Sequence, residues 1–110
     1  MTDEEKKTIR NEFANCVNMA PQELEDWLET SKSKSVGDSD TGESTGHEYG
    51  RHIVKIRRTH VADLSEDQYH QMRKVVGYAH RHLAQRPDGD IEETNWRYSL
   101  MNWGHDPLKT

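Results

Sequence analysis

One stretch of the sequence constrains the fold more than any other, because an apolar residue recurs at every helical turn over fifteen residues. The members of this stripe follow one another at spacings of three and four and are Tyr69, Met72, Val76, Ala79 and Leu83. These spacings place all of them on one face of an α-helix. Ser65 and Gln68 form a capping-box pattern ahead of the stripe, and the breaker RPDG at 86–89 follows it. We therefore expect a long amphipathic helix that begins after Ser65.

Capping boxes, a helix-initiating proline and a terminating glycine indicate the other helices. We expect one helix to start at Thr2 and end near Cys16, one to start at Pro21, one to span 45–59 and one to lie within 91–103. No segment alternates with period two for long enough to predict a strand. The predicted fold class is therefore all-α, a small bundle of about five helices.

The chain is poor in apolar residues, which restricts the size of its core. Leu, Ile, Val and Phe total 17 of 110 residues, about 15% and below the roughly 20% at which chains tend to be disordered. The net charge is only −5, however, and three Trp and four Tyr favour a small packed core. The deficit is greatest at 31–48, where Val36 is the only apolar residue. We therefore expect one domain over 1–110, with a disordered polar loop at 31–48 between the second and third helices.

Charge is distributed unevenly along the sequence. Residues 1–50 carry a net charge of −7, whereas residues 51–110 carry +2. Eight of the ten basic residues in the second half lie within 51–86, together with only three acidic residues. Such a cationic stretch fits an anionic partner, and it equally fits attraction between the two halves of one fold. The charge pattern alone leaves both interpretations open.

Six basic residues are the candidate contacts to nucleic acid. They lie on the outer faces of two predicted helices and are Arg51, Lys55, Arg58, Arg73, Lys74 and Arg81. Cations repeated along a helix face can neutralise successive phosphates, and Gly77, which has no side chain, would let a backbone approach closely. The hypothesis is a weak DNA binder that contacts mainly the backbone. The alternative is a solvated surface whose charge complements the acidic second helix.

The sequence lacks the common motifs of catalysis and metal binding. Cys16 lies in the apolar stripe of the first helix, so we expect a buried structural thiol. His80 and His82 are two residues apart on a helix and point about 200° apart, which prevents them from chelating one ion. No phosphate-binding glycine loop or nucleophile elbow occurs. We therefore expect a protein that is not an enzyme and uses no metal, cofactor or small-molecule substrate.

The apolar pattern also predicts location and assembly. No apolar run approaches the roughly 20 residues of a membrane span, and the first ten residues lack the apolar stretch of a secretory signal. We expect a cytoplasmic protein that does not contact membranes. In the last helix the expected core residues are Trp96, Leu100 and Trp103. Tyr98 and Met101 lie off that face and could contact a second copy, so a homodimer or another protein-interaction module is the alternative function.

Four longer strings of the sequence carry a family resemblance. They are ELEDWL at 23–28, MRKVVGY at 72–78, RHLAQRP at 81–87 and WRYSLMNWGHDPLK at 96–109. Together they resemble a bacterial domain-of-unknown-function family, number thirty-one-forty, over most of the chain and least at 31–44. Members of this family are commonly labelled DNA-binding proteins, so the resemblance implies a DNA partner. It implies no catalytic residues.

Overall fold

The computed structural model describes residues 1–36 and 45–109. Within these residues the chain forms six α-helices, two short 3-10 helices and no strand, which confirms the predicted all-α bundle. The α-helices are α1 (Asp3–Cys16), α2 (Pro21–Leu28), α3 (Ser31–Ser35), α4 (Thr45–Arg57), α5 (Glu66–Leu83) and α6 (Asn95–Asn102). The 3-10 helices are η1 (Val61–Asp63) and η2 (Pro107–Lys109).

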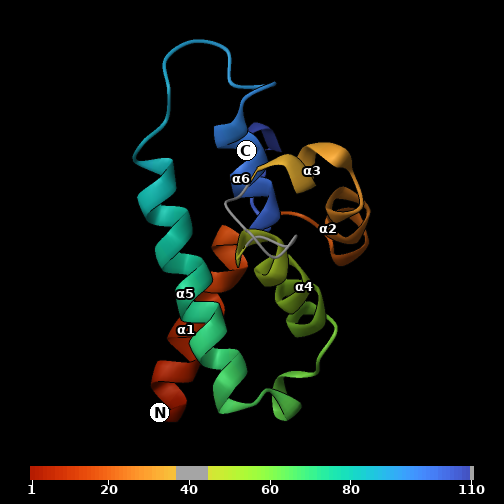
Figure 1. The fold of residues 1–110 in the computed structure, drawn as a ribbon. Helices are drawn as coiled ribbons and strands as arrows, with labels where there is room; N and C mark the ends of the chain where they lie inside the picture. The colour runs from red at the N-terminus through yellow and green to blue at the C-terminus, as the bar shows by residue number, and fades with distance from the viewer. Residues whose placement is uncertain (37–44, 110) are drawn as a thin grey trace.

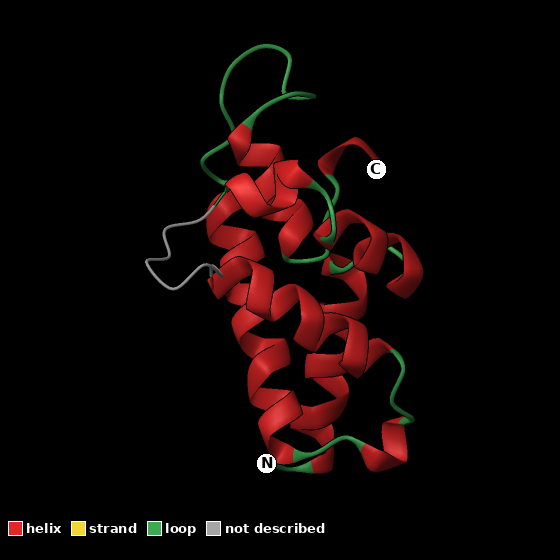
Figure 2. Ribbon diagram, turned by 45° about the vertical axis from the view of Figure 1, so that its right-hand side comes forward, coloured by secondary structure: helices red, strands yellow, loops and turns green. Residues whose placement is uncertain are grey.

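The two longest helices, α1 and α5, run alongside each other, and α4 packs between α5 and α2 (Figure 1). Helix α6 lies at the end of the bundle away from the N-terminus. The connection between α5 and α6, residues 84–94, projects beyond the helices at that end (Figure 2). None of the helices in the described part of the chain has the length and apolarity that a membrane crossing needs.

Local sequence signals define the helix ends as expected. The Thr2 hydroxyl accepts a hydrogen bond from the Glu5 amide, 3.1 Å long, at the start of α1. At the start of α5 the Ser65 hydroxyl accepts from the Gln68 amide, while the Gln68 side chain accepts from the Ser65 amide. Pro21 occupies the first turn of α2. These caps satisfy amides that have no partner within their own helix.

The apolar stripe of α5 faces the core. Its members Tyr69, Met72, Val76 and Ala79 are buried, and Leu83, at the end of the helix, is half-buried. Apolar side chains of α1, α2 and α4 complete the core, and Trp103 packs into it from the segment after α6. Burial of this apolar surface is the main stabilising contribution to such a small fold.

The prediction of a disordered loop from residue 31 is wrong for its first six residues. Residues 31–35 form α3, whose N-cap Thr30 accepts a hydrogen bond from the Ser33 amide. Ser33 and Val36 are buried. Hydrogen bonds between Ser33 and Asn102, together with the burial of Val36, anchor this segment although it is poor in apolar residues. Residues 37–44 of the expected loop lie outside the described residues, and the remainder belongs to α4.

The last helix lies within the expected range 91–103 but is more enclosed than expected. Tyr98 and Met101, which the helical pattern assigned to a possible partner, are each only 8% exposed within the chain itself. This burial arises because α6 contacts α2, α3, α4 and α5, so it has more than one inward face. Gly104 ends the helical segment with a φ of +81°, a backbone conformation that glycine adopts without strain. Its carbonyl accepts hydrogen bonds from the amides of Asn18 and Met19.

Candidate functional site

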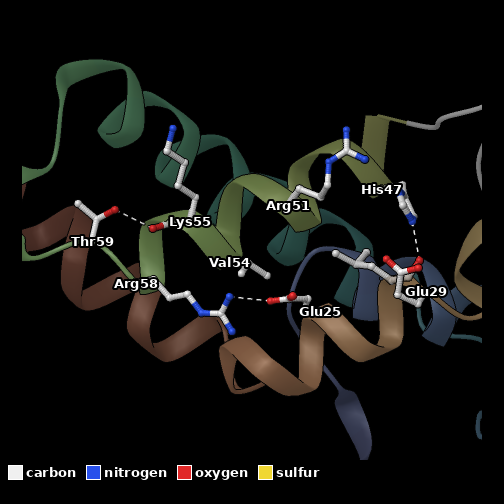
Figure 3. Close-up of a pocket in the computed structure, with 9 residues that line it drawn as sticks. Glu25, Glu29, His47, Arg51, Val54, Lys55, Arg58 and Thr59 are labelled. Carbon is white, nitrogen blue, oxygen red and sulfur yellow. Dashed lines mark hydrogen bonds and ion pairs between the residues drawn. The ribbon is translucent and has the colours of Figure 1, made fainter.

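Three of the predicted basic residues, Arg51 and Lys55 of α4 and Arg58 just after it, line an open groove between α4 and α2 (Figure 3). The groove has a volume of about 500 Å³. Arg58 points toward α2, where its Nη1 lies 2.6 Å from Oε2 of Glu25. Arg51 and Lys55 point away from α2 (Figure 3). Of these three basic residues, Arg58 is therefore the one whose charge is compensated by a carboxylate of α2.

Arg73 lies apart from the other basic residues of α5. It lines a second groove, of about 700 Å³, between α5 and α1. The α1 side of this groove carries three carboxylates, those of Glu4, Glu5 and Glu12. Gly77 borders the same groove, and a Cβ built there would meet only Nη1 of Arg81 within 4 Å. The groove beside Gly77 is open, but the three glutamates on its α1 side would repel a phosphate backbone.

Lys74 on α5 lies over an aromatic ring of α4. Its Nζ lies 5.3 Å from the ring centroid of Tyr49 on α4. Lys74 and Arg81 are seven residues apart, which places them on the same face of α5, and both are exposed. Arg51 and Lys55 point outward on the neighbouring helix α4, and we call the four residues Arg51, Lys55, Lys74 and Arg81 of these two helices the α4–α5 basic surface. Four of the six predicted residues thus belong to this surface, and Arg58 and Arg73 face grooves of mixed charge.

Several of these cations have no acidic partner in the described part of the chain. Lys55, Arg73, Lys74 and Arg81 are exposed and make no ion pair with any described residue. The sequence holds 20 acidic residues against 15 basic ones, so acidic side chains are not scarce. The described acidic residues nevertheless form ion pairs with only some of the six predicted basic residues.

Cys16 is a buried thiol, as expected. Its Sγ lies 3.7 Å from Nε2 of His80, and the side chain is 7% exposed. Burial, and to a smaller extent the negative charge of Glu12, raises the pKa of the Cys16 thiol, which therefore stays protonated and unreactive at neutral pH. His82 points elsewhere, with its Nε2 3.0 Å from the Trp96 carbonyl oxygen. Among the residues with described positions, no three potential metal ligands gather in one place.

Residues of the string at 96–109 hold the segment after α6 against the connection between α1 and α2. Arg97 and Asp106 form a two-point ion pair, with Nε 3.1 Å from Oδ1 and Nη2 3.0 Å from Oδ2. Asn18 exchanges hydrogen bonds with the backbone of Asp106. Burial alone would raise the pKa of the Asp106 carboxyl, but hydrogen bonds from Arg97 and the Leu108 amide, with the nearby charges of Arg97 and Lys109, lower it. The string at 96–109 thus has a structural role, because its polar side chains hold two segments of the fold together.

A family model described as "Protein of unknown function (DUF3140)" matches residues 12–101. The chain belongs to this family. The DUF3140 match extends from α1 into α6 and includes all six of the predicted basic residues. It confirms the resemblance seen in the four strings. No curated protein and no solved structure matches the chain significantly.

The acidic second helix is the predicted alternative partner of the cations, and its residue Glu25 meets Arg58 although the two residues are 33 positions apart. The glutamates of α1 that lie opposite Arg73 were not predicted. Each glutamate is visible in the sequence as part of an acidic helix. Which cation it faces depends on how the helices pack, and no local spacing encodes that packing.

Proposed function

We propose that this DUF3140 protein binds DNA weakly and mainly through the phosphate backbone, with the α4–α5 basic surface as the contact, and that it is not an enzyme. The observation that supports the proposal is that Lys55, Lys74 and Arg81 are exposed and make no ion pair with any described residue of an acid-rich chain. Unpaired cations along a helix face release condensed counterions when they neutralise phosphates, which is the main source of such affinity.

The geometry supports a smaller contact set than the six predicted residues. Arg58 is already paired with Glu25, and a phosphate would have to displace that carboxylate. Arg73 faces the three glutamates of α1. Both residues would therefore contribute less to DNA binding than Lys74 or Arg81, which make no ion pair with a described carboxylate.

The test is a matched pair of charge-reversal variants. K74E/R81E changes two residues of the α4–α5 basic surface, and K7E/K34E makes the same change in net charge at exposed lysines on α1 and α3. Fluorescence anisotropy with a labelled 20-mer at about 50 mM salt should give a loss of roughly tenfold or more for K74E/R81E, and about twofold or less for K7E/K34E. Equal losses in the two variants would show that only the total charge matters, and would contradict the assignment of a site.

The second candidate function is a protein-interaction module, and the α2–α4 groove favours it. One rim of the groove carries Glu25 and Glu29, the other rim carries the basic residues of α4, and Leu28 and Val54 lie between them. A partner helix with acidic residues toward α4 and basic residues toward α2 would match both rims. The homodimer is the case in which a second copy of this chain occupies the groove. Light scattering at high protein concentration decides this case, because a monomer excludes the homodimer.

A further inference from the structure

Five aromatic rings form a continuous stack where α4, α5 and α6 meet. In order they are Tyr49, Trp103, Tyr78, His82 and Trp96. Successive planes differ by 17°, 13°, 15° and 12°, and successive centroids lie 4.7, 4.1, 5.2 and 5.8 Å apart. Offset parallel stacking at these distances is favourable. The stack therefore passes through the buried Trp103 and ends in two half-buried residues, Tyr49 and Trp96.

A cation lies over the ring at each end of this stack. Nζ of Lys74 lies over Tyr49, and the guanidinium carbon of Arg86 lies 5.8 Å from the Trp96 centroid. Both cations are exposed, and neither makes an ion pair within the described residues. Each end of the stack thus combines a flat aromatic face with a long cationic side chain, which are the two elements of sites that bind single-stranded nucleic acids.

The Trp96 end has a fixed ring and a loosely held cation. The Trp96 Nε1–H donates to the His82 carbonyl oxygen at 2.8 Å, and His82 Nε2 lies 3.0 Å from the Trp96 carbonyl oxygen, which holds the indole in place. Arg86 lies on the projecting 84–94 connection and makes no hydrogen bond to a described residue. A flat base between the two groups needs about 7 Å, two contacts of about 3.5 Å, so a small movement of the Arg86 side chain admits it.

We propose that an unpaired nucleobase stacks on Trp96 beneath Arg86, so that the protein prefers single-stranded DNA to duplex. This inference rests on the proposed backbone binding. Lys74 and Arg81 are about 10 Å apart along α5. Trp96 stacks on His82, the residue after Arg81, so a strand that follows the two cations toward the C-terminal end of the helix comes to the Trp96 end of the stack. A duplex offers its base faces only to neighbouring bases, and it therefore cannot use this ring. Stacking is tolerant of sequence because every base has a flat face.

The test compares two 12-mers with equal numbers of phosphates, oligo(dT) and the same strand with abasic sites at its central positions. Wild-type protein should bind oligo(dT) at least about fivefold more tightly than the abasic strand. In Trp96→Leu this ratio should fall to about one, whereas Trp96→Phe, which also loses the indole N–H but keeps a flat ring, should retain most of it. Arg86→Ala should lower the ratio, while Lys34→Ala, at another exposed cation, should not.

The outcomes separate this inference from the proposed function. Equal wild-type affinity for the two strands would overturn base stacking and leave phosphate binding in place. Failure to bind either strand at about 50 mM salt would overturn both. Should circular dichroism show that Trp96→Leu does not fold, the wild-type ratio and the Arg86→Ala ratio still decide the matter, because neither depends on that variant.

Discussion

The indole Nε1–H of Trp27 donates a 2.8 Å hydrogen bond to the side-chain oxygen of Asn102, which lies 75 residues later and is 1% exposed. The Ser33 hydroxyl donates to the same oxygen, and the Asn102 amide nitrogen donates to the Ser33 carbonyl at 3.1 Å. One buried amide therefore joins α2, α3 and the end of α6. A buried polar group in such a network is stabilising only while its partners are present.

Asn102→Ala should lower the free energy of unfolding by about 2–4 kcal/mol, because it removes the partner of the part-buried Trp27 N–H and of the buried Ser33 hydroxyl. Urea denaturation followed by circular dichroism measures the change. Asn95→Ala, at the exposed start of α6, is the matched control and should change stability by less than about 0.5 kcal/mol. A similarly small effect at Asn102 would show that the network does not hold the helices.

Two glycine-to-alanine substitutions should change stability in opposite directions. A Cβ at Gly50 would lie 2.7 Å from the Asn102 carbonyl oxygen and 2.7 Å from a methyl carbon of Leu28, so Gly50→Ala should cost about 1–3 kcal/mol. A Cβ at Gly77 would meet only the flexible end of Arg81, and Gly77→Ala should gain about 0.5–1 kcal/mol from helix propensity. Thermal denaturation of the two variants and the wild type shows whether each substitution lowers or raises the stability of the fold. A loss at Gly77 would mean that α5 is packed there more tightly than the structure has it.

The Arg97–Asp106 pair should make stability depend on acid pH. The folded-state pKa of Asp106 is lowered, so its contribution to stability is present above the ordinary carboxyl pKa near 4 and is lost as the pH falls below it. Asp106→Asn should therefore cost about 2–4 kcal/mol at pH 7 and progressively less below about pH 4. Urea denaturation at several pH values measures this, with Asp88→Asn in the exposed connection as control. A penalty that does not change between pH 7 and pH 3 would contradict the pairing.

Local signals in the sequence predicted most of the helices. The Ser65 capping box and each pair of neighbouring residues in the α5 stripe span about one helical turn, and such contacts form wherever the helix forms. The helix α3 was missed because its anchor is distant: Ser33 is held by Asn102, 69 residues away. The burial of Tyr98 was missed for a related reason, since a helical stripe assumes one buried face and α6 has several neighbours.

The candidate site was predictable in its charges and less so in its geometry. The outward positions of Lys55, Lys74 and Arg81 follow from helical spacing alone. The pairing of Arg58 with Glu25 depends on the docking of two helices, which spacing does not determine. The aromatic stack was missed entirely, because its rings come from three separate helices and the segment after α6, and helical spacing had assigned Trp96 to the core.

The salt dependence of DNA binding tests the central claim most directly. If Lys55, Lys74 and Arg81 each neutralise one phosphate, the logarithm of the association constant for a single strand should fall against the logarithm of salt concentration with a slope of about −2. In K74Q/R81Q, which removes two of these three charges, the slope should be about −0.7. A wild-type slope near zero, or a slope that the double variant leaves unchanged, would contradict phosphate binding by the α4–α5 basic surface.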